Sequence, residues 1–275
     1  MMISIIAPCL NEERYLPYFF EGLLRQYLKN FEVIIVDGGS TDKSLKLIMK
    51  YKRKLARYDV QVKIVKTGRR NFGFIRNFGA KHANGDILFH ANTDNYFPPD
   101  LLFKLQTYYN THWWVYSVSG RVYPLGTSVI AHLGYQLFDL LRFTFTCAPV
   151  PVKKYRPSGN FMTVRAKTFW MLGGHPEVHA NEDGLFGAKF DKYLKKNHRM
   201  VRFNLNLYVG HWVKKFEQMG GIHAIFFYFY TLGNFAPILK PLLEPILRNA
   251  NSVFKGESKN QLTLRQVLYS MWDWL

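Results

Sequence analysis

H-A-N-T-D-N, residues 90 to 95, follows the apolar run 86–89 and precedes Pro98 and Pro99. The apolar run is typical of a buried strand, and the two prolines prevent further strand pairing. Asp94 is therefore expected just past the carboxyl end of a strand, where open parallel sheets bind their ligands. A lone carboxylate at such a point more often forms a turn, so its meaning depends on the rest of the chain.

Upstream of this stretch, predicted strands and helices alternate. Strands are expected at the apolar runs 3–7, 31–36 and 60–65, and helices at 16–27, at 45–51 and through 76–77. This alternation predicts a parallel sheet with helical crossovers. A dinucleotide-binding fold is rejected because the first turn, P-C-L-N-E-E, lacks G-x-G-x-x-G. The second turn, G-G-S-T-D, lacks the lysine of a P-loop.

The ends of the first elements also carry local signals. Pro8 is expected to end the first strand. Glu12 and Glu13 are expected to begin the first helix, because the helix dipole favours acids in the first turn. One of the residues 40–42 is expected to cap the second helix.

Charge and cysteine content narrow the class of protein. The 275 residues contain 37 Lys and Arg against 19 Asp and Glu, and the net charge of +18 indicates an anionic partner. Nucleic acid, a phosphorylated small molecule and an acidic membrane surface all fit that charge. Cys9 and Cys147 form no disulfide framework and no zinc spacing, and Cys9 is expected to pack as a small apolar residue. This cysteine content favours a reducing, cytoplasmic setting, and no signal-peptide pattern is visible in the first residues.

Several motifs, in this order, resemble the family 2 glycosyltransferases of the GT-A fold. Those of the nucleotide-sugar half are P-C-L-N-E-E at 8–13, V-D-G-G-S-T-D at 36–42, the run 68–86, and N-T-D at 92–94. Those of the acceptor side are S-G-N-F-M-T-V-R at 158–165, G-G-H-P at 173–176 and N-E-D at 181–183. The resemblance covers roughly residues 3 to 212. It implies an α/β, Rossmann-like mixed sheet, mostly parallel and flanked by helices.

The resemblance also implies the chemistry of the site. Asp183 would be the general base of an inverting transfer, with Glu182 tuning or positioning it. Asp94 would hold Mn²⁺ or Mg²⁺ together with the diphosphate, and His211 is a second candidate ligand. Structural alternatives remain open. The two acids could simply favour a helix start, and the histidine could pack beside Trp212.

The remaining candidate residues would bind the nucleotide-sugar. They are Pro8, Asn11 and Glu12 around the base and ribose, Asp37 on the base, Arg76 on the diphosphate with Asn77 orienting it, and Asn92 and Thr93 beside Asp94. Structural roles are the alternatives to nucleotide-sugar binding. Asp37 could simply cap its turn, and Arg76 and Asn77 could be ordinary residues on a helix surface. Two positions depart from the family pattern. Asn92 replaces the first acid of Asp-x-Asp, and Gly38 replaces a second acid beside Asp37.

Three segments are expected: 1–95 as the nucleotide-sugar half, 96–215 as the acceptor and catalytic half of the same domain, and 216–275 as a C-terminal helical segment. The last is aromatic, basic and interrupted by prolines, which favours a membrane surface over a span, with a homodimer contact as the alternative. The resulting hypothesis is an inverting, metal-dependent glycosyltransferase that uses a UDP- or GDP-sugar at the inner face of the cell membrane. Its acceptor would be a glycan or a polyprenyl-type lipid.

Two other functions compete with this hypothesis. A GT-A-like scaffold that has lost its first metal acid could bind nucleotides or glycans without turnover. Nucleic-acid binding is suggested by charge alone, and no nucleic-acid module is recognisable in the sequence, so nucleic acid is not an expected partner.

Overall fold

The computed structural model describes residues 1–275 apart from 70, 127–128, 148–153, 179–181, 194–199 and 213–275. The described chain divides into two compact units, one of Met1–Tyr123 with Arg142–His211 and one that contains Pro124–Leu141 and Trp212. All candidate site residues belong to the first unit. The expected tail, 216–275, lies outside the described residues, and the boundaries at 95 and 215 stay predictions.

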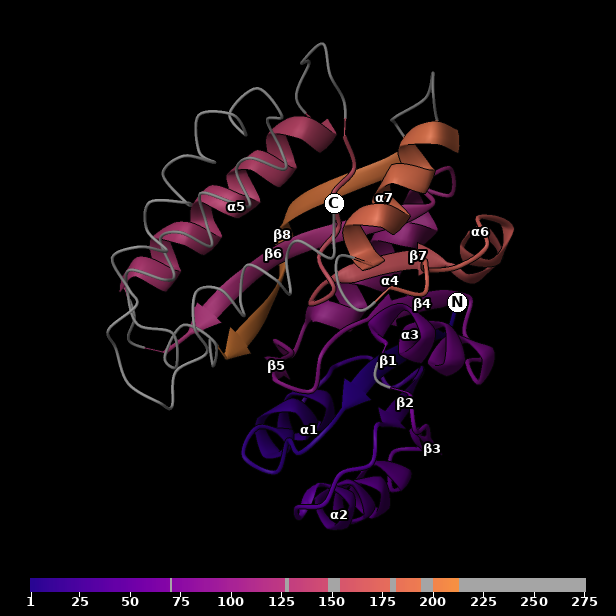
Figure 1. Cartoon of the computed structure of the whole chain (residues 1–275), viewed down its shortest axis with the longest axis vertical. Helices are drawn as coiled ribbons and strands as arrows, with labels where there is room; N and C mark the ends of the chain where they lie inside the picture. Colours follow the sequence, from indigo (N-terminus) through magenta and orange to yellow (C-terminus); the bar gives the residue numbers. More distant parts are fainter. Residues whose placement is uncertain (70, 127–128, 148–153, 179–181, 194–199, 213–275) are drawn as a thin grey trace, which may run out of the picture. The chain divides into compact units, whose positions relative to one another are not determined.

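Four strands form the parallel part of the sheet (Figure 1). They are β1 (Ile3–Cys9), β2 (Phe31–Asp37), β3 (Gln61–Lys66) and β4 (Ile87–His90), in the order β3-β2-β1-β4. β2 and β4 are buried along their whole length, as their uninterrupted apolar runs predict. Because the strands are parallel, their carboxyl ends share one edge, and the stretch 90–95 begins at that edge.

The sequence predicted that Pro8 ends β1, but the strand continues to Cys9. Pro8 is level with Val36 of β2, whereas pairing with β4 stops at Ile6 opposite His90. A proline lacks the N–H that a strand donates, so it fits where one neighbouring strand has already ended. Cys9 is buried, in agreement with its expected role as a small apolar residue.

The rest of the sheet is antiparallel where a direction is assigned. It consists of β5 (Asn95–Tyr96), β6 (Ser117–Leu125), β7 (Met162–Arg165) and β8 (Val201–Trp212), which continue the order as β4-β7-β6-β8-β5. β7 pairs antiparallel with β4 and β6, and β5 with β8. The described residues therefore form one mixed sheet of eight strands. The expected parallel arrangement is confined to its first half.

Seven helices lie in the described part of the chain. They are α1 (Leu16–Leu24), α2 (Ser44–Ala56), α3 (Phe72–Lys81), α4 (Leu101–Thr111), α5 (Val129–Cys147), α6 (Ala166–Met171) and α7 (Glu182–Tyr193). One core cluster joins Ile6 of β1, Ile34 of β2, Val164 of β7 and Phe186 of α7. The two halves of the sheet thus share a core. Among the described residues, no helix combines the length and the apolar character needed to cross a membrane.

The start of α1 differs from the expectation. The helix begins at Leu16, with Pro17 in its first turn and no acid there, so Glu12 and Glu13 precede it. It ends at Leu24, which leaves Tyr27 beyond the helix and 73% exposed. The two acidic residues bind the neighbouring loop instead. The backbone N–H of Glu12 donates to Ser44 Oγ at 2.8 Å, and Glu13 Oε2 accepts from the backbone N–H of Lys43 at 2.9 Å.

Candidate active site

The two predicted metal ligands, Asp94 and His211, lie close together in the structure. They are far apart in the sequence, since 116 positions separate His211 from Asn95, the residue after Asp94. β5 pairs with β8 so that Asn95 lies opposite His211. His211 Nδ1 lies 3.3 Å from Asp94 Oδ1 and 3.2 Å from Asn95 Oδ1. The pairing of a two-residue strand with the carboxyl end of β8 therefore builds this corner of the site.

The donor atoms of this pair suit a divalent cation. Metal–ligand bonds of about 2.1 Å at right angles place two donor atoms about 3 Å apart, close to the separation between Asp94 and His211. One carboxylate and one imidazole leave further positions for phosphate oxygens and water, which Mg²⁺ and Mn²⁺ accept. Within the described residues, no cluster of three or more His, Cys, Asp or Glu side chains forms a metal site. The protein would thus supply part of the coordination and the diphosphate another part.

The two acidic residues at the start of α7 have different environments. Glu182 is buried and ion-paired, since Arg76 Nε donates to its Oε1 at 2.9 Å. Burial and the charge of Asp183 raise the pKa of Glu182, while Arg76 acts in the opposite direction. Asp183 is half-buried, and its two oxygens accept from the backbone N–H groups of Gly159 at 2.6 Å and Gly184 at 2.7 Å. A simple helix-start role would expose both acids equally, and this pair is not equally exposed.

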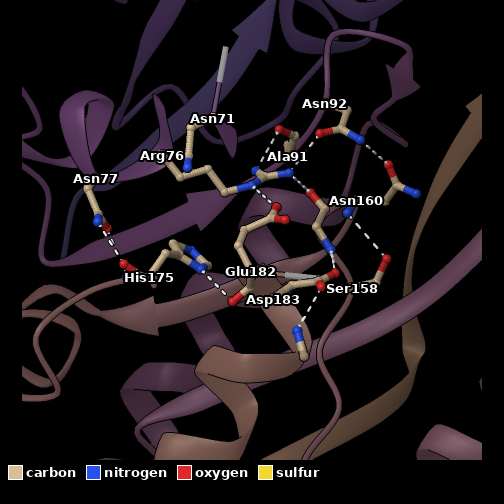
Figure 2. A network of polar contacts seen from close by, with 12 residues as sticks. Asn71, Arg76, Asn77, Ala91, Asn92, Ser158, Asn160, His175, Glu182 and Asp183 are labelled. Atoms are coloured by element: carbon tan, nitrogen blue, oxygen red, sulfur yellow. Dashed lines mark hydrogen bonds and ion pairs between the residues drawn. The ribbon is translucent and has the colours of Figure 1, made fainter. Parts of the chain in front are cut away.

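Arg76, which was expected to contact the diphosphate, is buried in the centre of a polar network (Figure 2). Besides Glu182, its guanidinium donates to the carbonyl oxygens of Ala91 at 3.3 Å and Gly159 at 3.0 Å. It also donates to Asn92 Oδ1 at 2.9 Å. These contacts exclude the alternative of a helix surface residue. The role at the diphosphate stays a prediction.

The loops after β1 and β2 are tied together at the carboxyl edge of the sheet. Asn11 adopts a left-handed backbone conformation with φ of 54°, and its Oδ1 accepts from the backbone N–H of Thr41 at 2.8 Å. Asp37 Oδ1 accepts from the backbone N–H of Ser40 at 3.1 Å, and its Oδ2 from Gly39 at 3.2 Å. Asp37 therefore caps its own turn, as the structural alternative foresaw. Its contact with a nucleotide base stays a prediction.

Two further candidates hold backbone segments in place. Thr93 Oγ1 donates to the carbonyl oxygen of Pro8 at 3.1 Å, which joins the end of β1 to the N-T-D stretch. Asn77 forms two bonds with His175, donating to its carbonyl oxygen and accepting from its N–H, both at 2.8 Å. Asn77 thus fixes the turn before α7 and does not orient Arg76 in this structure (Figure 2).

Comparison with known proteins identifies the family. The family model described as glycosyl transferase family 2 matches residues 4–168, which is more than half of the chain. The chain belongs to glycosyl transferase family 2. The resemblance seen in the motifs is thereby confirmed.

This family 2 glycosyltransferase matches only part of the length of its relatives. Poly(ribitol-phosphate) beta-N-acetylglucosaminyltransferase TarS of Staphylococcus aureus is 30% identical over 114 residues, which are 41% of this chain and 19% of that protein. A dolichyl N-acetyl-alpha-D-glucosaminyl phosphate 3-beta-D-2,3-diacetamido-2,3-dideoxy-beta-D-glucuronosyltransferase of Methanococcus voltae is 40% identical over 94 residues, 33% of this chain and 29% of that protein. The matched segments span less than a third of either relative.

Two solved structures show the same fold. TarS residues 1–349 in complex with UDP give a TM-score of 0.59 at 19% identity, covering 83% of this chain and 63% of that one. The mannosyltransferase PcManGT of Pyrobaculum calidifontis, in complex with GDP-Man and Mn²⁺, gives a TM-score of 0.62 at 17% identity. That match covers 98% of this chain and 69% of that one.

Some polar residues of this glycosyltransferase were not given a role from the sequence. Gly159 and Asn160 belong to the network around Arg76, in which Figure 2 labels Asn160. Outside that view, Asn95 contacts His211. The rings of His90 and His175 contact each other edge to face, with centroids 4.7 Å apart. Burial lowers the pKa of His90 well below its usual range and that of His175 to about 3, and the charge of Arg76 contributes to both shifts. An asparagine or histidine carries no periodic signal, so only the fold reveals these contacts.

Proposed function

We propose that this family 2 glycosyltransferase transfers a sugar from a UDP- or GDP-sugar to a hydroxyl or phosphate of a lipid-linked acceptor, with inversion at the anomeric carbon. The observation that carries this proposal is the convergence of two pairs in one network. Asp94 contacts His211 on one side, and Glu182 with Asp183 lies on the other. A cation site for a leaving diphosphate and a carboxylate for an incoming hydroxyl are what such a transfer requires.

Asp94 and His211 would hold Mn²⁺ or Mg²⁺, which when bound neutralises charge on the leaving diphosphate. Asp183 takes the proton from the acceptor hydroxyl. The N–H groups of Gly159 and Gly184 each occupy one lone pair of its carboxylate, so further lone pairs remain for that proton. The same two bonds hold the carboxylate in a fixed direction, which a general base needs.

Glu182 positions the network and does not itself receive the proton. Its carboxylate is buried and already paired with Arg76, so an acceptor hydroxyl would have to displace a guanidinium to reach it. The neutralised pair instead anchors the start of α7 to α3. This arrangement fixes the carboxylate of Asp183 at the adjacent position.

The relatives support the donor and acceptor classes. The solved structures include complexes with UDP and with GDP-Man and Mn²⁺. The names of the two relatives refer to a poly(ribitol-phosphate) and to a dolichyl phosphate. Both acceptors contain phosphate, which agrees with the net charge of +18.

The experiment measures hydrolysis and binding of UDP-N-acetylglucosamine and GDP-mannose, in Mn²⁺ and in EDTA, for the wild type and Asp94→Asn. We expect metal-dependent turnover of at least one donor and a loss of about tenfold to 100-fold in metal-dependent donor affinity for the variant. Donor binding without turnover would favour the alternative, a GT-A-like binding protein. Wild-type metal binding by Asp94→Asn would place the cation elsewhere.

We further propose that the protein works peripherally at the inner face of the cell membrane. α5 supports this proposal, because four of its exposed side chains are aliphatic and recur on one face: Val129, Leu133, Leu137 and Leu140. The opposite face buries polar residues, among them Asp139 and Arg142. A helix with its apolar side outward, in a chain of charge +18, suits an anionic lipid surface.

The test of membrane association is sedimentation with liposomes that contain anionic lipid. Leu133→Gln with Leu137→Gln should reduce the pelleted fraction several-fold, and high salt should release the wild type. A concentration-dependent dimer that dissociates in the same variant would replace the membrane with a homodimer contact. Equal pelleting of both proteins would contradict a role for α5.

A further inference from the structure

The dipeptide Gly159–Asn160 is hydrogen-bonded to four residues of the candidate site: Arg76, Asn92, Asn95 and Asp183. It lies in a turn closed by the bond from the N–H of Phe161 to the carbonyl oxygen of Ser158, at 2.8 Å, immediately before β7. The backbone of Gly159 donates to Asp183 and accepts from Arg76, at 2.6 Å and 3.0 Å. The backbone of Gly159 therefore connects Asp183 to Arg76.

Gly159 has no space for a side chain. A Cβ at this position would lie 2.6 Å from Arg76 Nη2, and 3.5 Å from Asp183 Oδ2. Because the guanidinium is held by Glu182 and Asn92 as well, it cannot move aside without breaking those bonds. The backbone of this turn is consequently packed directly against the ion pair.

Asn160 extends the network toward the metal pair by two separate bonds. Its Oδ1 accepts from Asn92 Nδ2 at 2.6 Å, and its carbonyl oxygen accepts from Asn95 Nδ2 at 2.6 Å. Asn92 in turn accepts from Arg76, and the side chain of Asn95 contacts His211. One residue thus joins the element that carries the metal ligands to the ion pair that anchors α7.

The neutral residue at position 92 is matched to this arrangement. The amide of Asn92 uses its oxygen for Arg76 and its nitrogen for Asn160. A carboxylate at 92 would place an oxygen against Asn160 Oδ1 and would compete with Glu182 for the guanidinium. The amide of Asn92 therefore forms hydrogen bonds through both its oxygen and its nitrogen, and Glu182 is the carboxylate that pairs with Arg76.

We propose that Asn160 is a positioning residue, which sets the placement of Asp183 relative to Asp94 and His211 through its side-chain bond to Asn92. This proposal rests on the proposed function, because the placement matters for transfer between a metal-bound donor and a base. The bond lies between two half-buried side chains on segments 68 positions apart, so its loss allows the turn before β7 to shift relative to the N-T-D stretch. Small displacements of catalytic groups lower the rate strongly while binding is retained.

The test compares Asn160→Ala, Asn160→Asp and a control, Asn110→Ala, which changes an exposed asparagine on α4. The readout is the steady-state hydrolysis of whichever nucleotide-sugar the wild type turns over in Mn²⁺. We expect kcat to fall about tenfold in Asn160→Ala, the size of one lost hydrogen bond. The donor KM should stay within about twofold, because the carbonyl bond to Asn95 is retained. Asn160→Asp keeps an oxygen acceptor for Asn92 and should restore most of kcat.

A double-mutant cycle shows whether the effect runs through Asn92. Asn92→Ala removes the shared bond, so adding Asn160→Ala should lower kcat by less than about twofold more. The same non-additivity should appear in the melting temperature, which does not depend on any activity. Wild-type kcat in Asn160→Ala, additive effects in the cycle, or equal losses in KM, kcat and melting temperature without rescue by Asn160→Asp would each overturn the proposal. Failure of the wild type to turn over any donor would instead contradict the proposed function, and the melting-temperature cycle would still test the bond.

Discussion

The two sides of the site are held together in different ways. On the donor side, the loops after β1 and β2 are joined by exposed side chains that bind backbone N–H groups, such as Asn11 with Thr41. The acceptor side is attached through a buried ion pair, in which its Glu182 binds Arg76 of the nucleotide-sugar half, 106 positions away. A buried charge that loses its partner costs far more than an exposed amide that can turn to water. Substitutions on the two sides should therefore differ in size, and four of them test that difference.

The largest effect is expected for Asp183→Asn. The asparagine cannot accept a proton, so the turnover rate should fall by about 10² to 10⁴-fold, while donor affinity changes little. Its NH₂ group would also face the N–H of Gly159 or of Gly184, which both donate to the native carboxylate. Rates and melting temperature are measured together, with Glu182→Gln as the comparison. Asp183→Asn with near-wild-type rates, beside an inactive Glu182→Gln, would reverse the two roles.

The next effect concerns the ion pair itself. Arg76→Met leaves Glu182 buried without its partner and should cost about 3–5 kcal/mol in the free energy of unfolding, measured with urea. In the double variant with Glu182→Gln the buried charge is gone, so part of that stability should return. An exposed pair, Lys54 with Glu21, provides the matched control, where Lys54→Met should cost less than about 1 kcal/mol. Equal costs at both pairs would contradict the difference between the two sides.

A smaller effect should appear in the pH dependence of stability. The folded pKa values of His90 and His175 lie below that of an unfolded histidine, and the groups facing them are Arg76, Lys189 and the carbonyl oxygen of Glu182. The unfolded chain therefore binds protons below about pH 6.5 that the folded chain does not, and stability falls as the pH decreases toward 3. His90→Phe removes one such group and should reduce the slope by about 1.4 kcal/mol per pH unit near pH 5.

The measurement for this prediction is urea unfolding between pH 4 and pH 7. Within the described residues neither ring nitrogen of His90 has a hydrogen-bond partner, so His90→Phe should not lower stability at pH 7 by breaking a bond. An unchanged slope in the variant would show that His90 already carries a proton in the folded protein.

The smallest effect is expected on the donor side. Asn11→Ala removes the bond to the N–H of Thr41 and places alanine at a left-handed φ of 54°. The two losses together should cost about 1–2 kcal/mol in unfolding free energy. Asn11→Gly loses the same bond without the backbone penalty and should cost about 1 kcal/mol less than alanine. A glycine variant that is no more stable than the alanine variant would show that the backbone conformation carries no cost.

Much of the donor half could be predicted because its signals are local. The apolar runs of β1, β2 and β4 and the motifs after them placed Asp37 and Asp94 correctly at strand ends. The errors at Pro8 and at Glu12 are also local in origin. A proline is tolerated in a strand once one neighbour has ended, and an acid before a helix, here Glu13, can accept from the backbone N–H of a neighbouring segment instead. Neither choice is visible without the neighbouring segment.

The sequence by itself determined the order of the first four strands and three helices, the positive charge and the residue types of the site, since periodicity and composition depend only on near neighbours in the chain. The tertiary structure alone decided which side chains meet. His211 reaches Asp94 because β8 pairs antiparallel with β5, and Arg76 reaches Glu182 because α3 and α7 pack on one core. The different environments of Glu182 and Asp183 arise in the same way. Two adjacent acids have the same local chemistry, but only the fold buries one of them beside a guanidinium and leaves the other half-buried, and the proposed roles rest on this difference.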